Sequence, residues 1–445
     1  MNHNYYSKSV LVLFLFVFLI LFYSCGKEKV KKEYKPNNAH EQYIYALEKA
    51  NLQKSVLYKQ FVKLSEDALI KPFEITIPYS EIFYIDHANP NAFGYKFELK
   101  RGQKITISTE LLSSDSIKLF LDVFRIRDSA NTSRYKVASS DSFKIEFTAR
   151  RNANYVLRIQ PELLCDVRCK VKIHKESSLL FPVMGKNRSA IQSFFGDPRD
   201  GGTRRHHGVD IFAKKHTDII ASADGYVGRS VNRGIGGRHV WIFYPSLRVR
   251  CYYAHLESVD IITGKKIKAG TKIGTVGNTG NARYTPPHLH FGIYQSGIGP
   301  VDPYYFIATP DKKPEKVSVQ IDLLEDFVRT NSNHVNFYSN GTISELSKYT
   351  SLNVLALTNN KVRVETPDGT KGFVNIKNVE VCSKPIETKI NSQIVNVFNK
   401  PSKGSLLINE LITNEEFGIY SLYGDFGLVK LKNGKMGWIN TSEII

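Results

Sequence analysis

The alternation of apolar and polar residues changes along the chain, and each change indicates a different kind of element. Between His40 and Leu69, apolar residues recur among charged ones without Pro or Gly, which predicts one or two amphipathic helices. From Pro72 to Ile173 the apolar spacing becomes two, as at Ile105 and Ile107, and turn clusters separate the runs. Short strands at this spacing predict a β-sandwich of about 100 residues.

The C-terminal part of the chain contains a repeated pattern. Residues 180–307 are rich in Gly and short apolar runs, and the polar, Pro-bearing residues 308–317 predict a linker. Beyond it, residues 364–375 resemble residues 429–440, each with an Asp-Gly or Asn-Gly pair followed by Gly-aromatic-aliphatic-Asn. An Asx-Gly pair between apolar runs is a strong hairpin signal. The two copies are similar to tandem bacterial SH3-like barrels, which either bind cell-wall peptides in secreted hydrolases or act as spacers.

The first 25 residues predict export from the cytoplasm. Lys8 precedes an unbroken apolar stretch of 14 residues, Val10 to Tyr23. A bilayer span needs about 20 residues, so this stretch has the length of a signal-peptide core. Ser24-Cys25-Gly26 resembles the acylation site of bacterial lipoproteins, which makes Cys25 the candidate lipid-attachment site. Gly26 favours the outer membrane, facing the periplasm; the alternatives are an uncleaved anchor and cleavage elsewhere.

Composition narrows the class of partner. The chain has 61 Lys+Arg and 42 Asp+Glu, a formal net charge of +19, which suits nucleic acid, a membrane face or a cell-wall polymer. Because the leader predicts export, we expect no nucleic-acid partner. Five cysteines in 445 residues are too few for a disulfide framework. Cys165 and Cys169 lie close enough in sequence to form one disulfide, or none.

Seven of the twelve histidines fall within 85 residues, and two short patterns among them suit a metal ion. In the first, His206 and Asp210 flank Gly208. Residues at i, i+2 and i+4 of an extended segment share a face, so an imidazole and a carboxylate point the same way with a gap between them. In the second, His288 and His290 share one face of a strand. Three protein ligands with an open position are the arrangement of catalytic zinc.

These patterns, in this order, resemble the lysostaphin/LytM family of zinc metalloendopeptidases, which hydrolyse peptide bonds in peptidoglycan. The matching stretches are His206 to Asp210, Ala223-Asp224-Gly225, Tyr253-Ala254-His255-Leu256, Gly277-Asn278-Thr279-Gly280 and His288-Leu289-His290-Phe291. Neither His-Glu-x-x-His nor Gly-x-Ser-x-Gly occurs in the sequence, so the common zincin and α/β-hydrolase sites are absent.

The resemblance assigns a role to each of five residues. It implies that His206, Asp210 and His290 bind one Zn²⁺, and that His288 and His255 are catalytic without binding the metal. Zinc lowers the pKa of its bound water to about 7 and polarises the scissile carbonyl. Histidine titrates in the range that a general base or acid needs. We expect His288 to be the base and His255 to stabilise the oxyanion, with the reverse assignment left open.

We therefore expect a mainly β, multidomain chain. The expected units are a lipoprotein-type signal peptide (1–25), a charged linker with an amphipathic helix (26–71), a β-sandwich (72–176), an antiparallel-β metallopeptidase domain (177–307), a linker (308–317) and two small SH3-like barrels (318–385 and 386–445).

The resemblance implies a zinc-dependent endopeptidase that hydrolyses cross-links or stem peptides of peptidoglycan with metal-activated water. The alternative is a non-catalytic or latent member of the same fold that activates or scaffolds another cell-wall hydrolase. Residues 26–175 are long enough to cover the groove of a latent form. The expected partners are peptidoglycan peptides, a membrane reached through the lipid anchor, and an unknown regulatory envelope protein.

Overall fold

The computed structural model describes residues 36–444 except 89, 113–116, 128–133, 141–142, 311, 318–320, 325–326 and 340. The expected signal peptide and Cys25 lie outside the described residues. Strands hold 49% of the described residues and helices 13%, so the prediction of a mainly β, multidomain fold is confirmed. Among the helices described, none combines the length and apolar character that a membrane span requires.

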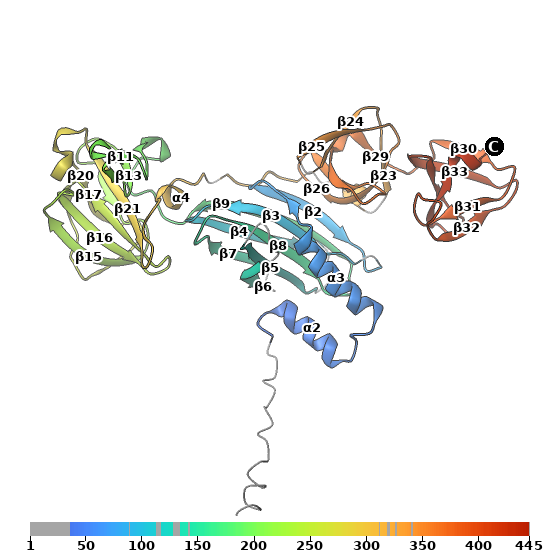
Figure 1. Ribbon diagram of the computed structural model, residues 1–445, viewed down its shortest axis with the longest axis horizontal. Coiled ribbons are helices and arrows are strands. Elements are labelled where there is room, and N and C mark those ends of the chain that lie inside the picture. The colour runs from blue at the N-terminus through green and yellow to red at the C-terminus, as the bar shows by residue number, and fades with distance from the viewer. Residues whose placement is uncertain are drawn as a thin grey trace, which may run out of the picture.

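In the part of the chain that the structure describes, two helices precede the sheets, as the helical spacing predicts. They are α2 (Ala39–Lys49) and α3 (Val56–Ile70), and a short α4 (Tyr304–Ile307) comes later. Asn38 and Ser55 begin the first two helices, because each side chain accepts a hydrogen bond from a backbone N–H of the first turn. Phe61 of α3 is buried and stacks on His40 of α2. The helices therefore pack through this apolar contact beneath the first sheets (Figure 1).

Residues 72–176, the sandwich module, form two facing sheets. One has the order β1-β3-β8-β5-β6. Its strands are β1 (Phe73–Glu74), β3 (Phe93–Leu99), β8 (Ala153–Pro161), β5 (Leu119–Ile126) and β6 (Arg134–Ser140). The other contains β2 (Tyr79–Ile85), β9 (Val167–Ser177), β4 (Gln103–Leu111) and β7 (Lys144–Thr148). Alternate residues of both sheets, such as Ile105, Ile107 and Leu157, share one buried core.

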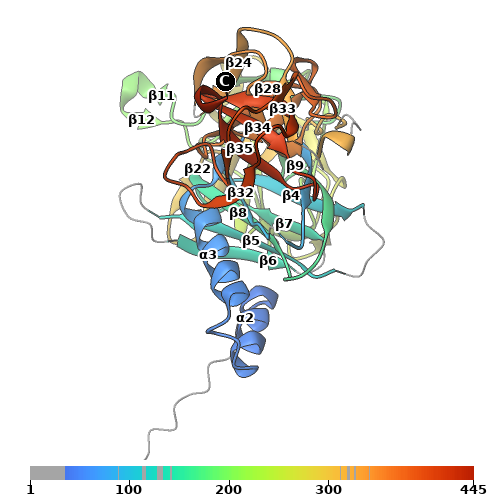
Figure 2. The same cartoon turned by 90° about the vertical axis from the view of Figure 1, so that its right-hand side faces the viewer.

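Residues 177–307, which we call the peptidase module after the resemblance described above, are built around an antiparallel sheet of eight strands. These are β10 (Ile191–Ser193), β13 (Val209–Phe212), β21 (His288–Gln295), β17 (Val249–Ala254), β16 (Arg238–Tyr244), β15 (Gly225–Asn232), β19 (Lys266–Ile267) and β22 (Gly299–Val301). A three-stranded sheet adds β14 (Asp218–Ile220), β20 (Lys272–Val276) and β18 (Leu256–Val259). The short hairpin of β11 (Pro198–Arg199) and β12 (Arg204–Arg205) projects from this module (Figure 2).

The repeated sequence forms the same hairpin twice. The first C-terminal module (318–385) contains β23 (Phe327–Thr330), β24 (Val335–Ser339), β25 (Thr342–Leu346), β26 (Ser351–Leu357), β27 (Lys361–Glu365), β28 (Lys371–Asn375) and β29 (Val379–Val381). The second (386–445) contains β30 (Glu387–Ile390), β31 (Val395–Phe398), β32 (Leu407–Leu411), β33 (Glu416–Tyr423), β34 (Phe426–Lys430) and β35 (Met436–Asn440). Val364 lies opposite Gly372 in one hairpin and Val429 opposite Gly437 in the other.

The strand order does not close either C-terminal module into a barrel in the part of the chain that the structure describes. The second module is an open sheet of order β30-β33-β34-β35-β31-β32. The strands of the first module belong to an 11-stranded sheet that also includes β2, β9, β4 and β7. The link is the antiparallel pairing of β2 with β26, with Ile82 opposite Leu357.

The modules are not arranged in space in their order along the chain. The peptidase module lies at one end of the molecule and the C-terminal modules lie towards the other, with the sandwich module between them (Figure 1). After α4 the chain runs back along the sandwich module to the first C-terminal module (Figure 1).

Candidate metal centre

The three predicted metal ligands come from two neighbouring strands and the segment before one of them. Asp210 lies on β13 and His290 on β21, and the antiparallel register places these two residues directly opposite each other. His206 lies between β12 and β13. Gly208 lets this segment approach β21, because a Cβ atom there would stand 2.6 Å from the Phe291 carbonyl oxygen and 2.8 Å from His290 Nε2.

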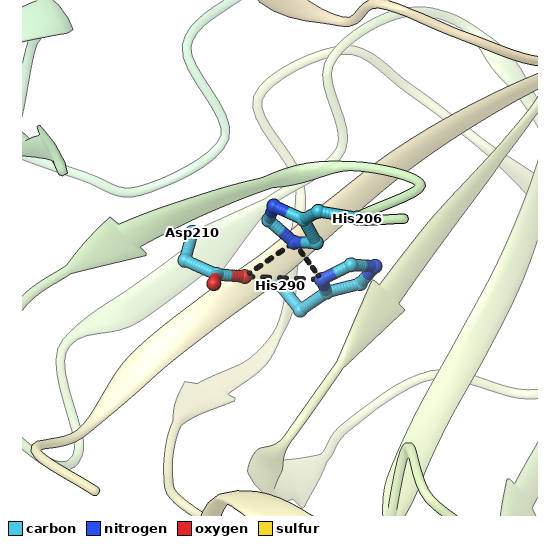
Figure 3. A group of neighbouring side chains, drawn as sticks. All are labelled: His206, Asp210 and His290. Atoms are coloured by element: carbon cyan, nitrogen blue, oxygen red, sulfur yellow. Dashed lines mark hydrogen bonds and ion pairs between the residues drawn. The ribbon is translucent and has the colours of Figure 1, made fainter. Parts of the chain in front are cut away.

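The ligand atoms form a nearly equilateral triangle (Figure 3). His206 Nε2 lies 2.9 Å from His290 Nδ1, and each of these nitrogens lies 3.0 Å from Asp210 Oδ1. Zinc bonds of about 2.0–2.1 Å place tetrahedral ligands about 3.3 Å apart. The triangle therefore has about the size that one zinc ion needs, and its donor atoms are chemically suitable. The fourth coordination position of such an ion would be open to the cleft.

Further contacts orient the ligands. Phe194 O lies 2.8 Å from His206 Nδ1. Because a carbonyl only accepts, Nδ1 carries the hydrogen and Nε2 presents its lone pair to the ion. On the other side of the centre, Arg199 Nη2 donates to Asp210 Oδ2 at 2.9 Å. The carboxylate thus keeps Oδ1 turned towards the two histidines.

Burial and charge act in opposite directions on these groups. Asp210 is buried, which by itself would raise its pKa, but hydrogen bonds and charge from His206 and His290 hold the pKa well below its usual value. Burial lowers the pKa of His290, against the opposite effect of Asp210. These directions favour an ionised Asp210 carboxylate beside a neutral His290 imidazole, and metal binding requires both of these forms.

The two predicted catalytic histidines lie next to this triangle. His288 begins β21, and its Nε2 lies 4.0 Å from Asp210 Oδ1. His255 follows β17 with a φ of 63°, and its ring centroid lies 5.0 Å from that of His288. His288 Nδ1 is 2.9 Å from Pro286 O, and His255 Nδ1 is 2.8 Å from Thr279 O. Both rings are therefore held by Nδ1–H donation, and neither belongs to the ligand triangle.

All five residues line one cleft of about 460 Å³. Arg199 and Arg204 also line this cleft. Its apolar and aromatic lining includes Ile235, Tyr252 and Tyr294. Every described residue that lines the cleft falls between 193 and 294. The described part of residues 26–175 therefore does not cover the groove in this structure.

The other histidines and the cysteines that the structure describes play no part in the triangle. His207 is exposed, and His216 sits on an exposed turn with a φ of 70°. His239 hydrogen-bonds through Nδ1 to Gly237 O and packs on Tyr252. Cys165 and Cys169 are free thiols, which agrees with the second of the two expectations for this pair.

Arg199 is the residue of this centre that sequence reasoning missed. It lies on β11, 11 positions before Asp210, and forms no recognisable pattern with the histidines. The projecting hairpin of β11 and β12 brings it back to the carboxylate. Only a signal for this hairpin, such as the glycine pair Gly201-Gly202 in its turn, would have indicated that Arg199 lies near His206.

The comparisons with known proteins concern the same segment. Residues 204–303 match the model of peptidase family M23. This match contains all five site residues, and it confirms the resemblance for this part of the chain: the segment is an M23 peptidase domain. The lipoprotein leader and the SH3-like modules lie outside the match.

Several curated relatives are similar to part of the chain. The chain is 37% identical over 101 residues to the peptidoglycan DD-endopeptidase ShyC of Vibrio cholerae, covering 23% of each chain. It is 33% identical over 123 residues to an L-Ala–D-Glu endopeptidase of Bacillus subtilis, covering 26% of this chain and 37% of the relative. A glycyl-glycine endopeptidase of Staphylococcus capitis, ALE-1, is 36% identical over 88 residues, covering 19% and 24%. The chain thus spans between about a quarter and two fifths of the length of these relatives.

A solved structure is similar to a quarter of the chain. The catalytic domain of lysostaphin from Staphylococcus simulans is 31% identical, with 25% of this chain and 87% of that domain covered and a TM-score of 0.23.

Proposed function

We propose that the peptidase module is a zinc-dependent endopeptidase that hydrolyses peptide bonds in bacterial peptidoglycan. The observation that carries this proposal is the triangle of His206 Nε2, Asp210 Oδ1 and His290 Nδ1, whose sides measure 2.9–3.0 Å, at the bottom of a cleft that also presents two further imidazoles. The relatives named above as peptidoglycan endopeptidases support the substrate class.

Three side chains of this module would hold the ion: His206, Asp210 and His290. A zinc ion bound there supplies a water of lowered pKa and polarises the scissile carbonyl. Arg199 keeps the carboxylate of Asp210 in position through Oδ2. The cleft walls orient the peptide and exclude bulk water from the reacting bond.

His255 and His288 exchange protons with the reacting groups through Nε2. Each ring commits Nδ1–H to a backbone carbonyl, so a neutral ring offers a lone pair at Nε2 and a protonated ring offers a donor there. Burial, followed by the charges of His288 and His290, lowers the pKa of His255 to about 4. Near neutral pH His255 is therefore an acceptor before the reaction and donates only after it has taken a proton. The lowered pKa of His255 does not by itself decide whether His288 or His255 is the general base, so the assignment of His288 as base and His255 as oxyanion stabiliser stays a prediction.

The proposal names the class of bond that is cleaved, a peptide bond of peptidoglycan, and not one particular bond. The relatives are named for three different bonds: a DD bond, L-Ala–D-Glu and Gly-Gly. The same ligand triangle serves hydrolysis of each of them, because water attack on a polarised carbonyl does not depend on the side chains beside it.

The test is digestion of purified peptidoglycan by the full chain, with products identified by mass spectrometry. We expect about one zinc per chain, new peptide termini among the products, loss of activity with a chelator and recovery with zinc. His290→Ala should lose both zinc and products, whereas His174→Ala, a change on β9 in the sandwich module, should lose neither. Stoichiometric zinc without any products would contradict the catalytic proposal and favour the non-catalytic member of the fold.

We also propose that Cys25 carries a lipid that holds the protein at the outer membrane, facing the periplasm. The support is the apolar stretch Val10 to Tyr23 followed by the Ser24-Cys25-Gly26 sequence. Labelling of cells with a fatty-acid analogue should mark the wild-type chain and leave Cys25→Ser unmarked. Equal labelling of both chains would overturn this anchor.

A further inference from the structure

The eight-stranded sheet of the peptidase module has an outer face that carries aromatic side chains. Along β16, Val240, Ile242 and Tyr244 are buried in the core. Successive side chains of a strand point to opposite faces, so Trp241 and Phe243 lie on the outer face. Trp241 is half-buried, and Phe243 is 39% exposed. The outer face of β16 therefore presents aromatic surface to solvent.

The neighbouring strands alternate in the same way and add three rings to this face. Their inward side chains, such as Val227, Tyr253 and Ile293, belong to the same buried core. The residues between them point outwards. We call the resulting surface the aromatic face, and its members are Tyr226 of β15, Trp241 and Phe243 of β16, Tyr252 of β17 and Tyr294 of β21.

The rings of the aromatic face adjoin one another across the four strands (Figure 1). The Trp241 ring centroid lies 4.6 Å from that of Tyr252 and 5.0 Å from that of Tyr294. Tyr226 lies directly opposite Phe243 in the antiparallel register of β15 and β16. Directly opposite side chains of neighbouring strands are close enough to interact. The five rings thus form one continuous surface on an ordered sheet.

The aromatic face begins inside the cleft of the candidate metal centre. Tyr252 and Tyr294 line that cleft, and the Tyr252 ring centroid lies 5.8 Å from that of the ligand His290. Trp241 and Phe243 continue the surface away from the metal ligands along β16. A ligand that leaves the cleft over Tyr252 therefore passes directly onto the aromatic face.

The distance from the metal centre suits the length of a short peptide. Tyr294 is four residues after His290 on β21, which is about 13 Å at 3.3 Å per residue. Four extended peptide residues also span about 13–14 Å. A polymer that carries such a peptide therefore reaches the aromatic face while one peptide bond lies at the metal centre.

The chemistry of the aromatic face suits sugar rings. The two sides of a pyranose ring present C–H groups, which are attracted to the electron-rich face of an aromatic ring. The ring's edge presents hydroxyl and amide groups, which need hydrogen-bond partners. Arg250 is exposed and lies directly opposite both Phe243 and Tyr294, so its N–H donors share this face. Burial, and then the nearby Tyr294, raises the pKa of Tyr252 to about 12, so its hydroxyl keeps its proton at neutral pH.

We propose that the aromatic face binds the glycan strand to which the cleaved peptide is attached. This inference rests on the proposed function, because peptidoglycan consists of glycan strands that carry short peptides. A membrane or a second copy of the chain also covers aromatic surface. Only the glycan is covalently joined to the peptide in the cleft, and the aromatic face is continuous with that cleft.

The first experiment measures binding of peptide-free glycan strands to the full chain. Trp438→Phe leaves Trp241 as the only tryptophan, so its fluorescence reports directly on the aromatic face. In this background Phe243→Ala should weaken binding about three- to tenfold, because one aromatic contact is lost. Phe243→Tyr keeps the ring and should bind as the parent. Phe143→Ala removes a ring that is also 39% exposed, in the sandwich module, and is the matched control.

The second experiment compares hydrolysis of intact peptidoglycan with hydrolysis of a glycan-free cross-linked peptide. Phe243→Ala should lower the ratio of kcat/KM for the two substrates at least about threefold, through a higher KM for the intact polymer. Tyr226→Ala changes a residue that is 45% exposed and should act in the same direction. Melting curves of all variants check that the fold is intact.

The two proposals fail in different ways. Glycan binding that depends on Phe243, without products from either substrate, would support the aromatic face and contradict the peptidase activity. Peptide hydrolysis with equal glycan binding by Phe243→Ala and Phe143→Ala would overturn the aromatic face alone. Loss of self-association or of vesicle binding in Phe243→Ala, with glycan binding unchanged, would also overturn it, since the occupant would then be a second copy or a membrane.

Discussion

At the scale of single residues, the candidate metal centre depends on a second contact that orients each ligand side chain. His206 offers Nε2 because Phe194 O holds Nδ1–H, and Asp210 offers Oδ1 because Arg199 holds Oδ2. Both contacts come from the segment that includes the β11–β12 hairpin, which has no ligand of its own. Groups of this kind commonly change metal affinity by 10–100-fold when they are removed.

Gly208 is the residue whose size matters most at the centre. In Gly208→Ala the new Cβ would meet the Phe291 carbonyl and the His290 ring at less than 3 Å, so either His290 or the backbone must move. We expect zinc affinity to fall by about 10-fold or more and stability to fall by about 1–3 kcal/mol. Competition with a zinc chelator measures the affinity. Gly404→Ala, where nothing lies within 4 Å of the new atom, is the matched control; equal behaviour of the two variants would refute the steric argument.

His255 should make the metal-free peptidase module sensitive to acid. Its pKa is about 4 in the folded chain against 6.5 for an ordinary histidine, so the unfolded chain binds more protons between these values. The free energy of unfolding is therefore fully retained above pH 6.5 and declines as the pH falls towards 4, by about 2–3 kcal/mol from this residue.

Denaturant unfolding at pH 7.5 and pH 4.5 measures this effect. Trp241 fluorescence in a Trp438→Phe background reports on the peptidase module. The decline should be smaller in His255→Gln by the stated amount. A variant with the same pH dependence as the parent chain would show that His255 is not the group responsible.

At the scale of elements, three strands and two hairpins explain most of the local organisation. β21 carries His288 and His290 at its start, and pairing with β13 on one side and β17 on the other brings Asp210 and His255 to the same place. In the C-terminal modules, the Asx-Gly turns join β27 to β28 and β34 to β35 in equivalent registers. Local sequence was sufficient for the hairpins, because their register follows from the turn.

The two repeats differ in how tightly they surround their equivalent glycines. A Cβ atom at Gly372 would stand 2.6 Å from the Tyr338 carbonyl and 2.5 Å from Phe337, whereas at Gly437 its nearest backbone atom is 3.4 Å away and its close contact is a Val397 methyl. Backbone cannot yield as a side chain can. Gly372→Ala should therefore cost about 1–3 kcal/mol and Gly437→Ala less. Denaturant unfolding of both variants checks the order, and a larger cost at Gly437 would contradict it.

At the scale of the whole molecule, a buried ion pair joins the sandwich module to the first C-terminal module. Arg363 donates to Glu81 at 2.6 Å and 3.1 Å, and the hydroxyls of Tyr79 and Tyr95 also donate to this carboxylate. Glu81 and Arg363 are 0% and 2% exposed. The pair lies beside the β2–β26 pairing, so the two modules share both a sheet and a polar contact inside it.

Removing one partner of this pair should be costly. Arg363→Met leaves a buried carboxylate without its cation, and we expect a loss of about 3–5 kcal/mol. Adding Glu81→Gln to it should recover much of that loss, because no uncompensated charge remains. Lys63→Ala, which breaks an exposed ion pair with Asp67, should cost under about 1 kcal/mol. Chemical unfolding of the three variants provides the comparison, and a single variant as stable as the double one would exclude the buried-charge explanation.

The sequence predicted the helices, the sandwich strands and the repeated hairpins, and the family resemblance singled out the five residues that line one cleft. The elements, and the pairs His206 with Asp210 and His288 with His290, rest on residues within a few positions of one another, where the helix or strand period decides which side chains share a face. It did not predict Arg199, because a hairpin of irregular sequence separates it from Asp210. It predicted two separate barrels, and the structure instead joins the first module to the sandwich through β2 and β26.

By itself, then, the sequence determined the local elements and the short segments that supply the imidazoles and the carboxylate of the candidate metal centre, because backbone periodicity and side-chain type are properties of short segments. Tertiary structure alone decided the spatial order of the modules, the contact of Glu81 with Arg363 across 282 positions and the alignment of aromatic side chains from four strands on one face of the peptidase module's sheet. Such contacts depend on how whole sheets pack, and no period or spacing along the chain encodes that packing.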